Sequence, residues 1–194
     1  IDTVLATWPD AVVELTDGPY EALLADLRSG AIDLIVGALR QPAPAADVVE
    51  EALFDDPYAV VARAGHPLIA AAHVTPAEMA AYEWVTARTG TPARAAFEGL
   101  FERISPPPRV RVETSSLVAT RAILATSDRL TLLSERQIEV DREAGLLDIV
   151  PFALPETSRR IGITTRADWV PSPLQAAFIE TLRNGFDTAG KLAL

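Results

Sequence analysis

Short apolar runs alternate with amphipathic stretches along nearly the whole chain, a pattern that predicts strands and helices taking turns. Residues 32–37 form an almost uninterrupted apolar run, which is typical of a strand covered on both faces. A helical periodicity precedes this run, starting at Pro19, which suits a first helical turn, and closing at Gly30. Together with a strand at residues 11–15, these elements predict a strand–helix–strand unit with parallel strands.

The same alternation continues to the C-terminus. It predicts further strands at residues 58–63, 83–87, 110–114, 129–133, 146–150 and 160–166. Most of the helices between them open on a serine or threonine, the residue types that N-caps prefer; these openings are Thr75, Thr91, Ser116, Ser134 and Ser172.

This order of elements predicts an α/β protein of two lobes, in which the chain crosses between lobes near residues 62 and 152. Lobe I uses residues 1–62 and 152–194, and lobe II uses residues 63–151. A chain that leaves a lobe and returns to it makes a two-strand hinge, so we expect a cleft between the lobes.

Composition narrows the function. The net charge of -10 has the wrong sign for a surface that binds duplex DNA, so DNA contact would need a segment outside this chain. There is no cysteine, which excludes disulfides and thiolate chemistry, and no apolar run long enough to span a membrane. The opening Ile1-Asp2-Thr3-Val4 is not a signal peptide, which favours the cytoplasm.

Residues for catalysis or metal binding are sparse. His66 and His73 lie in one short loop-like segment and are expected at the surface, and Asp55 and Asp56 read as solvated charge. No nucleophile elbow, phosphate-binding loop or zinc motif occurs. The sequence therefore predicts no enzyme, no metal and no cofactor. Trp84 is expected to pack in a core or at the hinge.

Several helix starts follow directly on strands. In a parallel α/β lobe these junctions lie at the carboxyl ends of the strands, where such folds bind ligands. Free N–H groups at a helix start suit anions and hydroxyl-rich solutes. Each hydroxyl alone is explained as a helix cap, but as a group the following residues indicate a binding edge: Thr86, Thr89, Ser115 and Ser116.

Four segments, in this order and spacing, resemble the effector domains of LysR-type transcription regulators. They are Leu27–Leu34 (LRSGAIDL), Gly65–Leu68 (GHPL), Glu113–Ser116 (ETSS) and Arg129–Ser134 (RLTLLS). The resemblance covers nearly all of the chain. Within the family, residues 37–40, 161–166 and 168–171 look most like the galactose-binding-protein regulator branch.

The resemblance implies a fold like that of type 2 periplasmic binding proteins, a small metabolite between the lobes, and homo-oligomers, either dimers or tetramers. It also implies an N-terminal winged helix-turn-helix, which this chain lacks. The first strand of lobe I is missing as well, because residues 1–8 read as the helix that follows it. Carried over from the family, the ligand-binding residues are Gly18, Pro19, Tyr20, Ala38, Leu39, Thr86, Thr89, Ser115, Ser116, Ser127 and Arg166.

Arg166 either meets a carboxylate of the ligand or forms a salt bridge at the hinge. The hydroxyls and amides of this site predict a small polar effector, a sugar derivative or a carboxylic acid. Two other functions are compatible with two lobes and a cleft. A solute-binding protein of a transport system would share the fold, but the Gly65–Leu68 element argues against it, and an enzyme would need a convergent acid, base or nucleophile.

Overall fold

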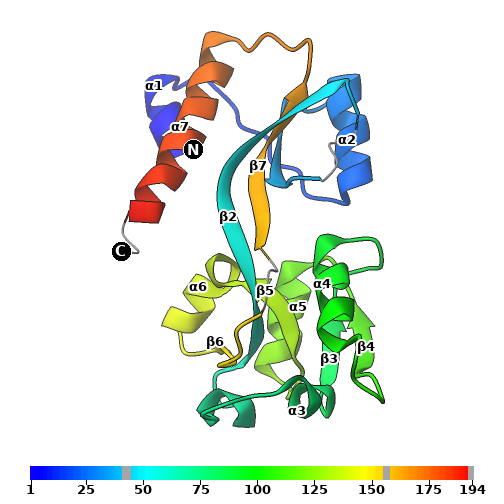
Figure 1. The fold of residues 1–194 in the computed structure, drawn as a ribbon. Coiled ribbons are helices and arrows are strands. Elements are labelled where there is room, and N and C mark those ends of the chain that lie inside the picture. Colours follow the sequence, from blue (N-terminus) through cyan, green and yellow to red (C-terminus); the bar gives the residue numbers. More distant parts are fainter. Residues whose placement is uncertain (41–44, 155–157, 192–194) are drawn as a thin grey trace. The chain divides into compact units, whose positions relative to one another are not determined.

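The computed structural model describes residues 1–40, 45–154 and 158–191, and the chain divides into two compact units. Unit 1 comprises Ile1–Asp55 and Arg160–Leu194, and unit 2 comprises Asp56–Arg159. The strand β2 (Val48–Arg63) leads from unit 1 into unit 2, and β7 (Ser158–Arg166) leads back (Figure 1). The chain therefore changes unit after Asp55 and after Arg159, whereas the predicted crossings lie near residues 62 and 152.

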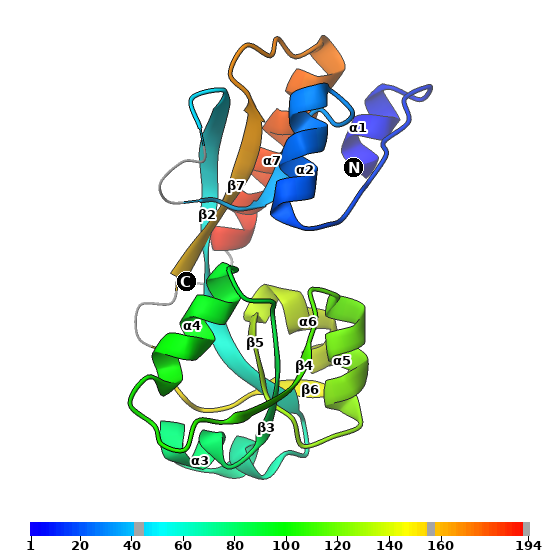
Figure 2. The same cartoon turned by 90° about the vertical axis from the view of Figure 1, so that its right-hand side faces the viewer.

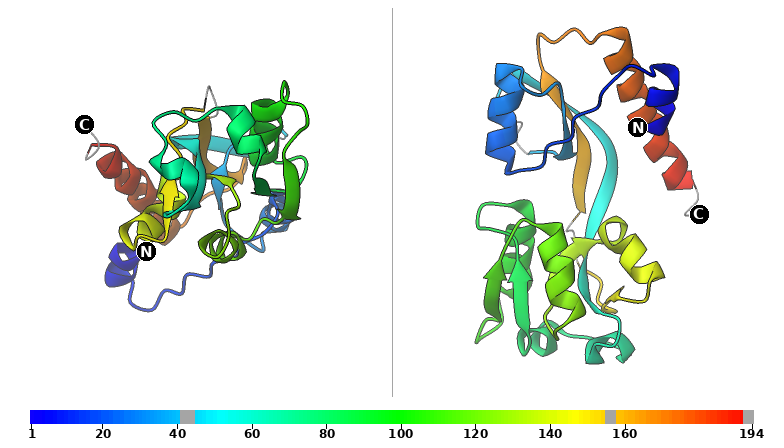
Figure 3. Two further views of the ribbon diagram at one scale, coloured as in Figure 1. Left: turned by 90° about the horizontal axis from the view of Figure 1, so that it is seen from below. Right: turned by 180° about the vertical axis from the view of Figure 1, so that it is seen from behind.

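In unit 1, β7 lies between β1 (Ile35–Ala38) and β2, and β1 runs antiparallel to β7. The helix α2 (Tyr20–Ser29) covers these strands, because its Leu24 and Leu27 pack with Ile35 and Val48 in one buried cluster. The short helix α1 (Asp2–Thr7) packs against α7 (Pro173–Lys191), as the blue and red helices of Figure 3 show.

The predicted strand at residues 11–15 is wrong. These residues form no strand in the structure, and the side chains of Val12 and Leu15 are 92% and 76% exposed. An extended segment becomes a strand only when it exchanges hydrogen bonds with a neighbouring backbone, and no described strand pairs with this one. The predicted parallel pairing in this lobe is therefore not formed, and β1 pairs only with β7 among the described strands.

Unit 2 contains two buried clusters, one on each side of β2. Along β2, Val60 belongs to the cluster with α3 (Pro76–Ala80) and α4 (Pro92–Phe101), whereas Val61 belongs to the cluster with α5 (Leu117–Ala125) and α6 (Glu135–Glu143). Neighbouring strand residues point to opposite faces, so one strand supplies both clusters. Figure 2 shows α4 on one side of the strands and α5 and α6 on the other.

The strands of unit 2 follow the predicted order. β3 (Glu83–Thr86) is parallel to β4 (Arg109–Glu113), while β5 (Thr131–Ser134) and β6 (Leu147–Ile149) are antiparallel to β2. Trp84 is fully buried at the centre, with its indole N–H donating to the Met79 carbonyl at 3.1 Å. Its ring lies 5.2 and 5.1 Å from those of Phe97 and Phe101, which confirms the predicted packing role.

His66 was expected at the surface and is instead 2% exposed. Its Nδ1 accepts from the Leu68 amide at 3.1 Å, at the start of the 3-10 helix η1 (Pro67–Ala70). Its Nε2 lies 3.3 Å from the Asp128 carbonyl. Because Nδ1 accepts, the ring is the neutral tautomer with its proton on Nε2. The residue types of this segment do not predict the burial, because it involves contacts with residues distant in sequence such as Tyr82, whose ring centroid lies 4.5 Å away.

Candidate functional site

The parallel pair β3 and β4 brings two strand–helix junctions to one edge of unit 2. β3 ends at Thr86 and β4 at Glu113, and the Thr114 amide continues the pairing by donating to the Thr86 carbonyl at 2.9 Å. The helices that follow are both capped: Thr91 caps α4, and Ser116 caps α5 by accepting from the Ala119 amide at 3.2 Å. The carboxyl ends of these strands and the starts of these helices therefore form one polar edge.

The predicted hydroxyls of unit 2 divide into those with a hydrogen-bonding partner and those without. Ser116 caps α5 at this edge, whereas Ser127 lies beyond the opposite end of α5 and donates to the Ile123 carbonyl at 2.6 Å. Thr86 is buried, and its Oγ1 accepts from Arg94 at 3.2 Å. Ser115 and Thr89 are exposed, and neither hydroxyl forms a hydrogen bond with the part of the chain that the structure describes. Among the predicted hydroxyls, these two are therefore exposed and without a partner in the described residues.

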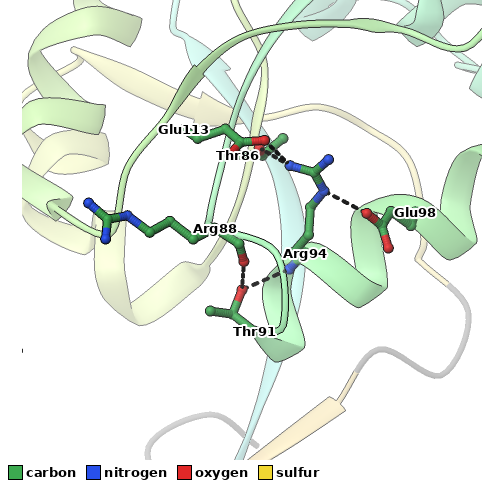
Figure 4. A network of polar contacts seen from close by, with 6 residues as sticks. All are labelled: Thr86, Arg88, Thr91, Arg94, Glu98 and Glu113. Carbon is green, nitrogen blue, oxygen red and sulfur yellow. Dashed lines mark hydrogen bonds and ion pairs between the residues drawn. The ribbon is translucent and has the colours of Figure 1, made fainter. Parts of the chain in front are cut away.

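Arg94 organises this edge, although the sequence reasoning did not select it. Its guanidinium donates to Glu113 at 2.5 Å from Nη1 and to Glu98 at 2.8 Å from Nε (Figure 4). Glu113 first, and then Glu98, raise the pKa of Arg94, so it stays charged. Arg94 thus ties α4 to the ends of β3 and β4. The sequence does carry a signal for Arg94. It lies three residues after the helix cap Thr91 and four residues before Glu98, which is the spacing of an ion pair along a helix.

A third feature of the edge is the loop between β3 and α4. The Thr91 hydroxyl donates to the Arg88 carbonyl at 2.8 Å and accepts from the Arg94 amide at 3.3 Å. Figure 4 shows the Arg88 side chain extending away from this network. The loop backbone is therefore fixed, while the side chains of Arg88 and Thr89 are exposed.

The predicted residues of unit 1 lie at the start of α2 and the end of β1. Gly18 and Pro19 precede α2, whose N-terminus has no side-chain cap, and Tyr20 is its first residue. The Tyr20 hydroxyl donates to Glu50 at 3.5 Å, and the Arg40 guanidinium lies 4.4 Å from the ring centroid. Burial, and then the Glu50 charge, raise the pKa of Tyr20, so its hydroxyl remains a donor.

Ala38 ends β1, and the Leu39 amide donates to the Arg160 carbonyl at 2.9 Å. Leu39 also contacts Gly162: a Cβ at that glycine would lie 2.8 Å from the Leu39 methyl groups and 2.1 Å from the Glu51 carbonyl oxygen. Both predicted residues are half-buried, so the structure fixes their backbone and leaves part of each side chain accessible.

Arg166 has a structural role within unit 1. Its Nη1 donates to the carbonyls of Leu27 at 2.6 Å and Ile32 at 3.1 Å, just where α2 ends. A guanidinium at a helix C-terminus satisfies carbonyls that have no partner inside the helix. In place of a salt bridge, Arg166 thus holds the C-terminal end of α2.

A buried ion pair lies where the chain passes between units, and here the expectation of solvated charge is wrong. Asp56 is 5% exposed and accepts from Arg159 at 2.8 and 3.2 Å. The same guanidinium donates to Gln137 at 3.0 Å and lies 4.8 Å from the centroid of the Tyr58 ring. The pair joins β2, β7 and α6, elements that are far apart in sequence.

No cluster of His, Cys, Asp or Glu suited to a metal ion occurs in residues 1–40, 45–154 and 158–191. Over the same residues, no helix has both the length and the apolar character that crossing a bilayer requires.

Two α/β units joined by two chain crossings, with capped strand–helix junctions, define a class: ligand-binding domains with the fold of type 2 periplasmic binding proteins. The chain belongs to the LysR substrate binding domain family, whose model matches residues 1–187. The resemblance that the sequence motifs carried is confirmed.

Among curated relatives, the chain is 34% identical over 179 residues to the HTH-type transcriptional regulator GalR of Pseudomonas putida. That match covers 92% of this chain and 45% of the relative. It is 31% identical over 189 residues to the HTH-type transcriptional regulator PcaQ of Agrobacterium fabrum, covering 97% of this chain and 60% of the relative. The chain thus spans about half the length of these regulators.

Among solved structures, the regulatory domain of CcmR from Synechocystis PCC6803, described in complex with 2-PG, is similar with a TM-score of 0.79. The sequences are 21% identical, and the match covers 95% of this chain and 88% of that domain. This likeness establishes the fold.

Proposed function

We propose that this chain is the effector-sensing part of a LysR-type transcription regulator that acts in the cytoplasm, and that it is not an enzyme. The observation that carries the proposal is the fixed polar edge of unit 2, where two free hydroxyls stand beside two capped helix starts. The net charge of -10 supports DNA contact through a part of the regulator outside this chain. An effector that favours one conformation would be coupled to DNA binding by its differential affinity alone.

The proposed effector is a small polar metabolite, a sugar derivative or a carboxylic acid. In unit 2 we assign its contacts first to Ser115 and Thr89, whose hydroxyls are free, and next to Thr86 and Ser116. In unit 1 we assign contacts to Gly18, Pro19, Tyr20, Ala38 and Leu39. We assign no contact to Ser127 or Arg166, because Ser127 donates to Ile123 at the C-terminal end of α5 and Arg166 donates to two carbonyls at the C-terminal end of α2.

The test compares Ser115→Ala with the double variant S115A/S116A, by calorimetry with the compound that gives the largest saturable thermal shift in a panel of sugars, sugar acids and hydroxy acids. S115A removes a free hydroxyl, so affinity should fall several-fold while stability is unchanged. The double variant also removes a helix cap and should lose about 0.5–2 kcal/mol of stability. Thr126→Ala, at the opposite end of α5, is the control. Unchanged affinity in a folded S115A/S116A variant would contradict the site.

We also propose that the chain forms homo-oligomers, dimers or tetramers, as family membership supports. Sedimentation velocity at tens of micromolar tests this, and a strictly monomeric profile would argue against it.

A further inference from the structure

One arginine of unit 1 differs from the other half-buried arginines that the structure describes. All of the others donate to an acceptor of the protein: Arg63, Arg94, Arg121, Arg129, Arg159, Arg166 and Arg183. The guanidinium of Arg40 has no hydrogen-bonding or ionic partner within residues 1–40, 45–154 and 158–191. Its Cζ instead lies 4.4 Å from the centroid of the Tyr20 ring. A half-buried cation for which the described residues supply no acceptor is suited to bind the acceptor of a ligand.

A carboxylate bonds to the Arg40 backbone and to the Tyr20 ring on which the guanidinium stacks, and not to the guanidinium itself. Glu50 Oε1 accepts from the Arg40 backbone amide at 3.3 Å and from the Tyr20 hydroxyl at 3.5 Å. Glu50 therefore holds both the backbone and the ring beneath the guanidinium, while no ion pair joins it to the guanidinium among the described contacts. Stacking on a ring uses the face of a guanidinium and leaves its in-plane N–H donors free. These donors are preorganised, so less entropy is lost when they bind.

We propose that Arg40 is a specificity-determining residue that binds a carboxylate of the effector, with Tyr20 as its stacking platform. A carboxylate is planar and matches the guanidinium fork with two parallel hydrogen bonds. Arg40 follows Ala38 and Leu39 and lies on Tyr20, which are all assigned contacts of unit 1. Arg166, the cation that the sequence selected for this role, already donates to two carbonyls. This inference rests on the proposed function and narrows the effector from polar metabolites to carboxylates.

The experiment titrates the 194-residue chain with benzoate, with uncharged benzamide and with inorganic phosphate at constant ionic strength. NMR follows the arginine Nε–H resonances, and the Arg40→Lys spectrum assigns that of Arg40. The Arg40 resonance should move saturably with benzoate and stay in place with benzamide. R40K keeps the charge but loses the planar fork, and Tyr20→Leu removes the platform. Both R40K and Tyr20→Leu should weaken benzoate binding at least five-fold. The Tyr20 ring resonances report binding in R40K, and the Arg40 resonance reports it in Tyr20→Leu.

Arg103→Lys is the control, because Arg103 is exposed and lies in unit 2. It should leave benzoate binding unchanged. An Arg40 resonance that benzoate does not move, or that moves no more than that of Arg103, would overturn the proposal. Tighter binding of phosphate than of benzoate would overturn the assignment to carboxylates. Failure of the proposed function would show separately, as the absence of binding by any compound of the panel, while the Arg40 resonance still reports on carboxylates.

Discussion

Replacing Arg159 by methionine removes the guanidinium that neutralises Asp56, while the methionine keeps much of the apolar stem. The side chains of Asp56 and Arg159 are 7% and 19% exposed, so water cannot take over the role of the lost partner for Asp56. The Asp56 carboxylate would remain buried with both hydrogen bonds from Arg159 removed. The variant also removes the contacts of the guanidinium with Gln137 and the Tyr58 ring.

Breaking a fully buried ion pair by removing one partner costs about 3–5 kcal/mol. Because Arg159 retains some exposure, we expect R159M to lower the free energy of unfolding by about 2–4 kcal/mol. The matched control is Arg142→Met, which breaks a pair with Asp148 whose side chains are 45% and 39% exposed. Exposed pairs contribute about 0–1 kcal/mol, so R142M should have a much smaller effect.

Urea denaturation followed by fluorescence measures these differences. In a background of Trp8→Phe and Trp169→Phe, the buried Trp84 is the remaining tryptophan and reports on unit 2. Adding Asp56→Asn to R159M removes the buried charge and should recover about 1–2 kcal/mol, because an unpaired neutral group costs less than an unpaired charge. If R159M proved no more destabilising than R142M, or if D56N failed to rescue it, the assignment of a buried ion pair would be wrong.

Two further perturbations follow from named contacts. Burial lowers the pKa of His66 below its usual 6.5, so below that pH the unfolded chain binds more protons than the folded chain. The free energy of unfolding should therefore decrease as the pH drops below about 6.5, by up to about 1.4 kcal/mol per pH unit. Urea titrations of wild type and His66→Asn at several pH values should show this slope in the wild type alone, and equal slopes would refute it. Gly162→Ala places a Cβ against the Glu51 carbonyl and should lower the free energy of unfolding by about 1–3 kcal/mol, measured by thermal denaturation. Gly37 lies opposite Gly162 in the β1–β7 pair and has open space at its Cβ position, so Gly37→Ala should be nearly neutral.

The sequence predicted unit 2 well because its elements carry local signals. Thr75 and Ser134 each open a capping box, with Glu78 and Gln137 returning the bond to the cap backbone. These interactions involve residues three apart, so they are visible in any short window of sequence. β3 and β5 are mostly buried, and β4 alternates exposed charged residues with valines, so each strand has a recognisable pattern.

Unit 1 and the chain crossings were harder because their decisive contacts are long-range. The segment 11–15 has the composition of a strand, yet strand formation depends on a partner backbone that no local pattern specifies. Asp56 and Arg159 are distant in sequence, and each alone resembles an ordinary surface charge. Their burial follows from β7 returning beside β2, which only the topology determines.

Ser115 and Ser116 show why the candidate site could be located from the sequence but not resolved into roles. Both follow a strand and precede a helix, so the residue types place both at the same polar edge. A cap must accept from an amide about three residues later, and in the structure Ser116 accepts from Ala119. Because Ser116 is the cap, the hydroxyl of the neighbouring Ser115 is exposed and has no partner among the described residues. The same distinction separates Arg166 from Arg40. The Arg166 guanidinium donates to backbone carbonyls and so supports the fold. The Arg40 guanidinium stacks on the Tyr20 ring and keeps its donors free, which is the arrangement that recognition of an effector needs.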